Sequence, residues 1–351
     1  MKKILTIIIP TYNMEKYLDR CLSSLLVEDE RMDRFEALII NDGSKDSSLE
    51  IAHRYQERFP RTFHVIDKTN GHYGSCINTG LKEATGTFVR ILDADDCFDT
   101  VVFSRYLDFL SRDDVSGKAD VILSNYIDVD NQLIPFRELK YSNYNGPVSL
   151  DMLTKHDILE WFMPGLTYRT ALPIDHGYRQ LEGVPYTDQE WAFTPAAYAK
   201  TLYRFDESLY LYVHGREGQS VDDAVHAKNI HVETQVIERL IRTYHEIDDK
   251  IVTTSKPFLR TRLSMLCSNI YQLYLLTFTR FKPSYSPLYS FDRFLKEHDP
   301  ALYEETSNYT TRIAGIPFQP VKDWREGNKF RLSLQQTIYR IADWKNHLFS
   351  K

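Results

Sequence analysis

The chain has 351 residues, of which 42% are hydrophobic and 13% aromatic, and its formal net charge is −6. These apolar side chains can form a sizeable core, which excludes a disordered chain, and the length favours about two domains. A slightly acidic chain also argues against a dedicated nucleic-acid-binding protein.

The charge is divided unevenly along the chain. Residues 1–225 carry 24 basic and 36 acidic side chains, a net charge of −12, whereas residues 226–351 carry 19 basic and 13 acidic ones, a net charge of +6. The basic second part is suited to an anionic partner. No cysteine belongs to a C-x-x-C pair, so the sequence favours reduced thiols in a cytosolic protein over a zinc site or a disulfide framework.

The first residues predict a buried strand rather than a targeting signal. The apolar run at residues 4–9 has only six residues and is followed by Pro10 and Thr11, not by a small-residue cleavage site. No apolar stretch of about 18 residues occurs in the sequence, so no transmembrane helix is predicted.

Strand and helix patterns alternate over the first 125 residues. Short apolar runs predict strands at 4–9, 35–40, 63–66, 87–92 and 120–124. Apolar residues spaced three or four apart predict helices at 14–26, 47–59, 73–84 and 100–110. Gly86 is expected to cap the third of these helices. The alternation predicts an open, mostly parallel α/β sheet flanked by helices.

The remaining chain falls into two parts. Residues 126–225 are irregular, with a hairpin expected around Asp130 and Asn131, and a helical pattern begins after residue 225. The sequence therefore predicts one domain at 1–225, with halves at 1–125 and 126–225, and a helical, basic C-terminal domain at 226–351.

Three carboxylates follow the fourth predicted strand, in Asp93-Ala94-Asp95-Asp96. Carboxylates this close repel one another, and a hard cation such as Mg²⁺ or Mn²⁺ relieves the repulsion. Asp93 and Asp95 are thus candidate metal ligands, and Asp96 is a candidate cap for the next helix. The alternative is a solvated acidic turn. Asp42, at the end of the second predicted strand, favours the metal site.

Two further polar turns follow strands two and three. Ligands of open α/β sheets bind beyond the carboxyl ends of the strands. Asp42, in Asn41-Asp42-Gly43-Ser44, could accept hydrogen bonds from a base imide or a ribose, although simple turn chemistry also explains it. Asn70-Gly71 opens a helix, and helix N-termini favour anions, but the spacing is not that of the dinucleotide-binding fingerprint.

These segments together resemble the ordered motifs of the family 2 glycosyltransferases. The motifs are Ile8-Ile9-Pro10-Thr11-Tyr12-Asn13, Asn41-Asp42-Gly43-Ser44, Asn70-Gly71, Asn78-Thr79-Gly80-Leu81, Ala84-Thr85-Gly86 and Leu92-Asp93-Ala94-Asp95-Asp96. The resemblance covers residues 4–100 and continues more weakly to residue 220. It implies a GT-A fold, which is Rossmann-like with a mostly parallel sheet flanked by helices, here followed by a helical C-terminal region. It also implies inverting transfer from a nucleotide-diphosphate sugar with Mg²⁺ or Mn²⁺.

The resemblance assigns donor-binding roles to eight positions. Those that would hold the nucleoside are Pro10, Thr11, Tyr12 and Asp42. Those that would lie near the nucleotide are Lys68 and Asn70. Those that match the D-x-D pair, and would engage the ribose-diphosphate and the metal, are Asp93 and Asp95.

An inverting transferase also needs a base that takes the proton of the acceptor hydroxyl. The family carries this base in a Glu-Asp pair after the D-x-D, and Thr187-Asp188 stands at the corresponding distance here. Asp188 is therefore the first candidate for the base, and Glu190 is the second. The alternative is a helix N-terminus capped by Thr187 with acids in its first turn.

The segment 214–220 resembles the loop that closes over the donor diphosphate in the family. Arg216 would then clamp phosphate, and His214 would be a third metal ligand. The alternative is a glycine-rich turn.

The basic second part contains two acid-poor, aromatic stretches, at 250–291 and 327–351. A basic amphipathic helix is typical of a membrane-surface segment, and the tail 327–351 is the candidate for peripheral membrane contact. The alternatives are a helix packed on the enzyme and a contact in a homodimer.

The sequence thus predicts an enzyme of cell-envelope polysaccharide biosynthesis. It would move a sugar from a nucleotide-diphosphate sugar, with a UDP-sugar favoured, to a glycan or lipid-linked glycan by metal-assisted single displacement. The alternatives are a nucleotidyltransferase on a similar sheet and a non-catalytic nucleotide or glycan binder. The expected location is the cytoplasm, at the inner face of the cell membrane, and no nucleic-acid partner is expected.

Overall fold

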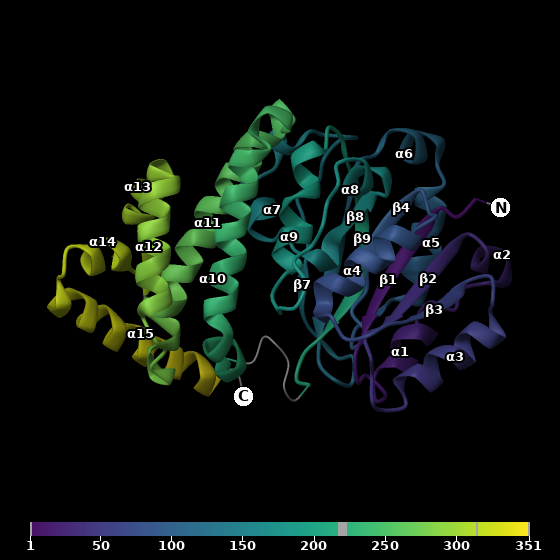
Figure 1. The fold of residues 1–351 in the computed structure, drawn as a ribbon, viewed down its shortest axis with the longest axis horizontal. Coiled ribbons are helices and arrows are strands. Elements are labelled where there is room, and N and C mark those ends of the chain that lie inside the picture. The colour runs from purple at the N-terminus through teal and green to yellow at the C-terminus, as the bar shows by residue number, and fades with distance from the viewer. Residues whose placement is uncertain (1, 217–222, 314, 350–351) are drawn as a thin grey trace. The chain divides into compact units, whose positions relative to one another are not determined.

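The computed structural model describes residues 2–216, 223–313 and 315–349, with side chains up to residue 342 (Figure 1). It divides into two compact units, Met1–Glu217 with Asp248–Leu259, and Gly218–Ile247 with Arg260–Lys351. The first change of unit lies near the predicted domain boundary at 225/226. Residues 248–259 belong to the first unit again, so a single boundary cannot separate the two units.

The first unit contains a nine-stranded sheet. In sheet order, the strands are β3-β2-β1-β4-β8-β6-β9-β5, with β7 paired to β6. Their bounds are β1 (Leu5–Thr11), β2 (Phe35–Asn41), β3 (Phe63–Asp67), β4 (Phe88–Ile91), β5 (Cys97–Phe98), β6 (Val121–Val129), β7 (Pro135–Leu139), β8 (Leu166–Arg169) and β9 (Leu202–Val213). Strands β3, β2, β1 and β4 are parallel to one another, as are β6 and β9. The expected parallel α/β sheet is thereby confirmed, with antiparallel additions at β5, β7 and β8.

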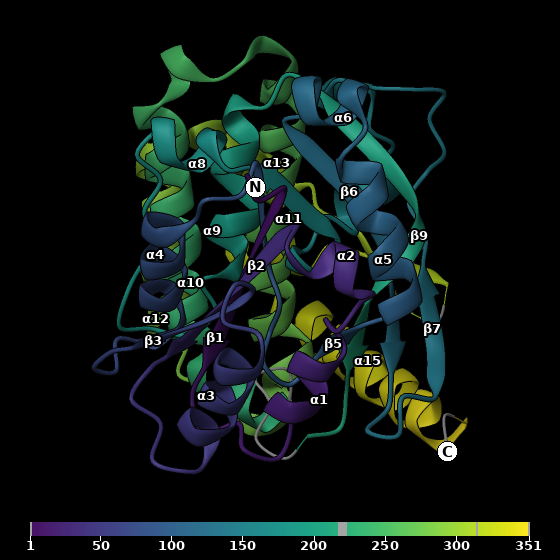
Figure 2. The same ribbon diagram turned by 90° about the vertical axis from the view of Figure 1, so that its right-hand side faces the viewer.

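The helices of this unit alternate with the strands. They are α1 (Leu18–Ser23), α2 (Asp29–Met32), α3 (Ser48–Arg58), α4 (His72–Glu83), α5 (Thr100–Leu110), α6 (Asp113–Lys118), α7 (Lys155–Leu159), α8 (Ala171–Asp175) and α9 (Asp188–Phe193). Figure 2 shows β1 and β2 between α4 on one side and α2 and α5 on the other. The ring of Phe35 on β2 contacts Phe103 on α5, with centroids 5.1 Å apart.

Two glycines let the chain approach β1 closely. A Cβ on Gly80 of α4 would lie 2.6 Å from the Ile8 side chain, so the helix packs directly on the strand. Gly86 was predicted to cap α4, and this is wrong, because α4 ends at Glu83 and Gly86 does not adopt a left-handed conformation. Instead, a Cβ on Gly86 would lie 2.5 Å from the Thr6 amide nitrogen. The strand itself therefore requires glycine there.

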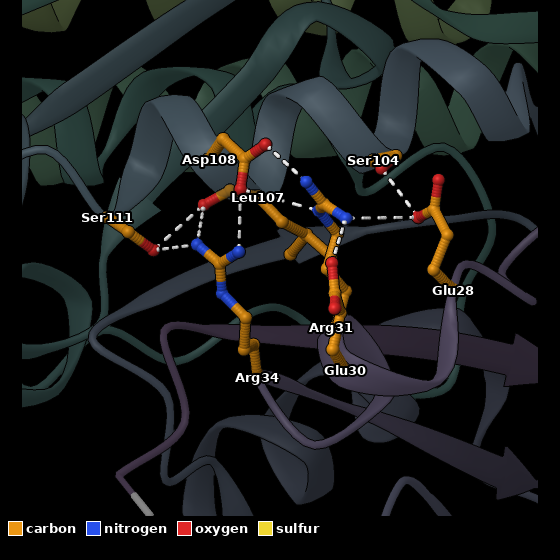
Figure 3. Close-up of polar contacts among 8 residues, drawn as sticks. All are labelled: Glu28, Glu30, Arg31, Arg34, Ser104, Leu107, Asp108 and Ser111. Carbon is orange, nitrogen blue, oxygen red and sulfur yellow. Dashed lines mark hydrogen bonds and ion pairs between the residues drawn. The ribbon is translucent and has the colours of Figure 1, made fainter.

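An ion-pair network ties the turn before β2 to helix α5 (Figure 3). Asp108 accepts hydrogen bonds from Arg31 at 2.8 Å and from Arg34 at 2.7 Å, and Arg31 also bonds Glu28 at 3.5 Å and Glu30 at 3.0 Å. Because Asp108 is half exposed, solvent weakens each of these ion pairs. The network positions α2 beside α5.

The second unit is mostly helical, as predicted. Its elements are α10 (Asp223–Glu246), α11 (Lys256–Leu275, which begins in the first unit), α12 (Ser286–His298), α13 (Pro300–Ser307), β10 (Thr311–Ile313), β11 (Ile316–Phe318), α14 (Pro320–Arg325) and α15 (Lys329–Phe349). Arg325 joins several of them, donating to Asp292 on α12 and lying over the Tyr303 ring on α13. None of the helices in the described part of the chain is long and apolar enough to cross a membrane.

Candidate functional site

The site lies at the carboxyl ends of the parallel strands. Strands β1 and β2 end in register at Thr11 and Asn41, and β3 ends at Asp67. The following loops are tied together: the Asn13 amide donates to Ser44 Oγ at 3.0 Å, and Asn13 Oδ1 accepts from the next amide, Lys45, at 2.8 Å. The first two polar segments predicted from the sequence therefore form one connected surface.

The predicted nucleoside residues of the first loop differ in accessibility. The Thr11 side chain is buried and donates to the Ile9 carbonyl at 3.1 Å, so its hydroxyl is engaged within the strand. Tyr12 is 43% exposed, and Pro10 is partly exposed at the strand end. The Tyr12 ring is thus the group of this loop that is free to stack on a planar ligand.

Asp42 is the centre of a second set of contacts. Its carboxylate is almost fully buried and accepts from Lys68 Nζ at 2.6 Å and from the Gly71 amide at 2.9 Å. Asn70 Nδ2 donates to the Asp42 carbonyl oxygen at 2.9 Å. The structure therefore brings the predicted residues Asp42, Lys68 and Asn70 together at the start of α4. A buried carboxylate paired with one ammonium retains acceptor capacity for a ligand.

The three aspartates after β4 point to different partners. Asp93 accepts from Tyr73 Oη at 2.9 Å, and Asp95 accepts from Arg216 Nε at 2.8 Å. Asp96 is buried and accepts from Tyr210 Oη at 2.5 Å and from the Val213 amide at 2.7 Å. Asp93 and Asp95 thus face the site, whereas Asp96 anchors β9.

Asp96 was expected to cap the next helix, and this is wrong. The cap of α5 is Asp99, whose side chain accepts from the Val102 amide at 2.9 Å. Asp96 is instead drawn to β9 because Tyr210 and Val213 donate to both of its oxygens. Burial raises the pKa of Asp96 well above its ordinary value, and the nearby Asp95 and Asp93 charges add to this shift.

The carboxyl of Asp93 has a perturbed pKa. Burial and the adjacent Asp95 charge raise it to about 7, against the opposing effect of the Tyr73 hydroxyl. The Asp188 charge contributes to the same rise, and it also contributes to the raised pKa of the Tyr73 hydroxyl, for which burial is the main cause. The charge of Asp188 is therefore felt at both Asp93 and Tyr73.

The side chains at this edge of the sheet are suitable ligands for a hard divalent cation. The carboxylates of Asp93 and Asp95, separated by one residue, face the site, and the positive Arg216 lies beside Asp95. His214 does not join them: its Nε2 lies 3.2 Å from Asp128 Oδ1, and its ring packs on Phe136 and Tyr212. Among residues 2–216, 223–313 and 315–349, no group of three or more His, Cys, Asp or Glu side chains is arranged to hold a metal. The rest of the predicted loop, residues 217–220, lies outside the described residues.

The two candidate bases stand in different environments. Asp188 opens α9 and is partly exposed, with Gln189 Nε2 donating to its Oδ2 at 3.3 Å. Glu190 is 3% exposed, and its carboxylate accepts from the Leu181 amide at 2.6 Å. Thr187 precedes α9 but makes no side-chain capping bond to it. Glu190 therefore fixes the preceding loop, while Asp188 is accessible at the helix start.

A loop clamp holds the segment 178–187 against α4. Asn78 Nδ2 donates to the Gln180 carbonyl at 2.8 Å, and Asn78 Oδ1 accepts from the Gln180 amide at 2.9 Å. A Cβ on Gly74 would lie 1.9 Å from the Leu181 carbonyl oxygen. The buried Gln180 side chain donates to Thr187 Oγ1 at 3.0 Å. The segment that leads to Asp188 is thereby packed on the helix that carries Tyr73.

Four of these positioning side chains were not identified from the sequence: Tyr73, Asn78, Gln180 and Tyr210. Asn78 belonged to a quoted motif, yet its partner lies 102 residues away. Tyr210 reaches Asp96 across 114 residues. The position of Tyr73, just after Asn70-Gly71 at a helix start, is the one local signal that could have been used.

Comparison with known proteins places the chain among glycosyltransferases. Residues 6–156 match the family model described as glycosyl transferase family 2. The glycosyltransferase EpsJ of Bacillus subtilis (strain 168) is 28% identical over 60% of this chain and 61% of its own length. The poly(ribitol-phosphate) beta-N-acetylglucosaminyltransferase TarS of Staphylococcus aureus (strain Mu50 / ATCC 700699) is 27% identical over 62% of this chain and 37% of its own length. The chain thus spans less than two thirds of either relative.

Solved structures show the same fold. The S. aureus TarS 1–349 structure in complex with UDP-GlcNAc matches 90% of this chain and 95% of its own, with a TM-score of 0.54 at 20% identity. A mannosyltransferase from Pyrobaculum calidifontis in complex with GDP-Man and Mn²⁺ matches 100% of this chain and 88% of its own, with a TM-score of 0.52 at 16% identity. The expected GT-A fold is confirmed, as is the resemblance to glycosyl transferase family 2, which the family model finds over residues 6–156.

Proposed function

We propose that the chain is an inverting glycosyltransferase that takes a sugar from a UDP-sugar. One observation carries this proposal: the start of α4, from its N-cap Gly71 to Tyr73, joins two acidic centres of the site. Its Gly71 amide bonds Asp42 at 2.9 Å, and its Tyr73 hydroxyl bonds Asp93 at 2.9 Å. A nucleoside held at Asp42 would therefore lead its diphosphate towards Asp93 and Asp95.

The nucleoside would rest on Tyr12 and hydrogen-bond to Asp42. A uracil imide donates one hydrogen bond, and the Asp42 carboxylate, oriented by Lys68 and the Gly71 amide, is a suitable acceptor. Lys68 is 18% exposed and could also face the diphosphate. TarS, which is 27% identical to this chain over the aligned part and has been solved with UDP-GlcNAc, supports a uridine donor.

Asp93 and Asp95 would hold Mg²⁺ or Mn²⁺ together with the donor. When bound, such a cation neutralises charge on the leaving diphosphate. The Mn²⁺ complex of the mannosyltransferase supports this choice of metal. Arg216 now pairs with Asp95, and its fork of donors suits a diphosphate equally well, so it would hold phosphate once the donor is bound. His214, turned towards Asp128, would reach the site only after a change of the loop.

Asp188 would act as the base. It would accept the acceptor hydroxyl proton as that oxygen attacks the anomeric carbon from the side opposite the diphosphate, which inverts the configuration. Its influence on Asp93 and Tyr73 supports a position across the donor site. Glu190 is the weaker candidate, because its carboxylate is buried and holds the Leu181 amide.

The acceptor would be a glycan or a lipid-linked glycan at the cytoplasmic face of the cell membrane. The name of TarS, a poly(ribitol-phosphate) beta-N-acetylglucosaminyltransferase, supports a polymeric acceptor. A nucleotidyltransferase is disfavoured because Thr11 and Tyr12 replace the glycine-rich phosphate loop that such an enzyme would carry after β1. A non-catalytic binder is disfavoured by the accessible Asp188.

A panel of nucleotide sugars tests the proposal. With Mn²⁺ present, a UDP-sugar is expected to raise the melting temperature and to be hydrolysed slowly to UDP, because water can replace the acceptor. GDP- and CDP-sugars serve as matched controls, since they share the diphosphate and differ in the base. Absence of any effect by every nucleotide sugar would contradict the proposal. If the chain prefers a GDP-sugar, the assignment of a uridine donor is wrong but the proposed glycosyl transfer stands.

A further inference from the structure

Helix α15 leaves one apolar side uncovered. Phe330 is 80% exposed, Leu334 47% and Ile341 53%. Residues four, seven and eleven positions apart lie on the same side of an α-helix, so these three side chains share one side, here named the outer row, with the exposed Thr337 between Leu334 and Ile341. The helix is the last one of the chain, drawn in yellow in Figure 1.

The opposite side of α15 is held by the helical unit. Gln335 is buried and donates to Asp323, Gln336 Nε2 donates to the Leu275 carbonyl at 2.9 Å, and Tyr339 shares a hydrogen bond with Thr277 at 3.0 Å. The orientation of α15 is therefore fixed by polar contacts along its inner side. On its outer row, most of Phe330 and about half of Leu334 and of Ile341 remain exposed.

Cations flank the outer row on both sides. Lys329 and Arg340 lie on one flank of the outer row and Arg331 lies on the other. Residues 327–342 contain no Asp or Glu. Arg331 lies 3.4 Å from Asp323 but keeps 64% of its side chain exposed. An exposed apolar row between two basic flanks is the arrangement of helices that lie in a lipid interface.

We infer that α15 docks on an anionic lipid surface, with the outer row among the acyl chains and the flanking cations at the headgroups. Charge favours lipid over a second copy of this chain. In a symmetric contact of two α15 helices, the same basic flanks would face each other and repel. Anionic headgroups instead complement both flanks at once. The inference concerns attachment alone and holds whether or not the proposed sugar transfer is correct.

Vesicle sedimentation of the full chain, without nucleotide, tests the inference. The chain is expected to bind vesicles of phosphatidylcholine with phosphatidylglycerol, to bind phosphatidylcholine vesicles much more weakly, and to dissociate as salt is raised. Failure to bind the anionic vesicles, or equal binding to both kinds, would overturn the inference.

Two paired variants assign the binding to this surface. Phe330→Ser with Leu334→Ser is expected to weaken vesicle binding about tenfold, because two exposed apolar side chains are lost from the interface. The matched control is Val101→Ser with Ile174→Ser, which removes side chains of the first unit that are 66% and 46% exposed. Equal effects of the two pairs would contradict the inference.

The charge variants complete the test. Lys329→Gln with Arg340→Gln should weaken binding and flatten its salt dependence, whereas Lys82→Gln with Lys118→Gln, on exposed positions of α4 and α6, should do neither. Light scattering identifies the competing outcome. If Phe330→Ser with Leu334→Ser converts a dimer into a monomer and leaves vesicle binding unchanged, the outer row is a self-contact and the inference is wrong.

Discussion

Asn78 on α4 hydrogen-bonds both main-chain polar groups of Gln180, a residue 102 positions later in the chain. One side-chain amide thereby imitates the paired bonds of a β-bridge. This contact joins the segment leading to Asp188 to the helix whose Tyr73 reaches Asp93. The distance between the proposed base and the donor site therefore depends on a residue that touches neither.

Asn78→Ala tests this dependence. The change leaves two main-chain groups of Gln180 without their partner, so we expect a loss of about 1–3 kcal/mol of unfolding free energy. We also expect a lower kcat with little change in the KM for the donor, because Asp42 and Lys68 are not disturbed. The measurements are urea unfolding and steady-state kinetics. Lys82→Ala, on an exposed position of the same helix, is the control. An unchanged kcat would show that the loop clamp does not position the base.

Gly74→Ala tests the same contact by adding one methyl group. The new Cβ would lie 1.9 Å from the Leu181 carbonyl oxygen, so the loop must move away from α4. We expect a destabilisation of about 1–3 kcal/mol, as for overpacking in a core. Gly117→Ala is the matched control, because this helical glycine has no neighbour within 4 Å of the new atom. It should stabilise the chain by about 0.5–1 kcal/mol. Equal melting temperatures for the two variants would contradict the packing.

Asp95→Asn tests the proposed metal pair. Removal of its charge should weaken Mn²⁺-dependent UDP binding at least about tenfold, while metal-free UDP binding at Asp42 and Lys68 should persist. The measurement is calorimetric titration with UDP, with and without Mn²⁺. Asp113→Asn, in the first turn of α6 and outside these motifs, is the charge-matched control. Equal dependence on Mn²⁺ in Asp95→Asn and the unmodified chain would remove Asp95 from the metal site.

Asp157 makes stability depend on pH. Burial opposes ionisation, but hydrogen bonds from the Ser142 amide, Tyr144 and Thr154 outweigh it and lower the pKa of Asp157. Because the pKa of Asp157 is lower in the folded chain, its ionised carboxylate stabilises the fold at pH values above the pKa of about 3.9 that Asp has in the unfolded chain. This contribution is lost as the pH falls through the pKa of the folded chain.

Asp157→Asn should therefore reduce unfolding free energy by about 2 kcal/mol at neutral pH. The difference in unfolding free energy between this variant and the unmodified chain should shrink in strong acid. Urea unfolding at neutral pH and in strong acid measures it. Asp151→Asn, at an exposed position six residues earlier, should change stability by less than about 0.5 kcal/mol. A difference that stays constant with pH would contradict the lowered pKa.

Strands β1, β2 and β4 could be predicted because they are buried on both faces. Strands β1 and β2 are nearly continuous apolar runs, and each predicted end lay within two residues of the observed one. Strand β6 extends five residues beyond its predicted end at residue 124, because it carries polar Asn125 and Asp128 inside. Strands β8 and β9 were not predicted, since β9 mixes polar and apolar residues without a strict alternation.

Most candidate site residues were predicted because they follow strands, whereas Asp188 and Glu190 were predicted from the resemblance to the family. Asp42 and Asp93 became candidates because they stand at carboxyl ends of the sheet, and the structure brings their surroundings together through α4. The partners of Asp96 and of Asn78 could not be found, because a hydrogen bond between residues more than 100 positions apart leaves no local pattern. His214 was predicted beside the aspartates but packs on Phe136.

The central claim is that this edge of the sheet transfers a sugar with Asp188 as the base. The most direct measurement compares the unmodified chain with Asp188→Asn for binding of a UDP-sugar with Mn²⁺ and for sugar transfer to a glycan acceptor. We expect the variant to bind the donor with unchanged affinity and to transfer the sugar at least about 100-fold more slowly, since the acceptor proton has no base. Transfer at the unmodified rate would contradict the account.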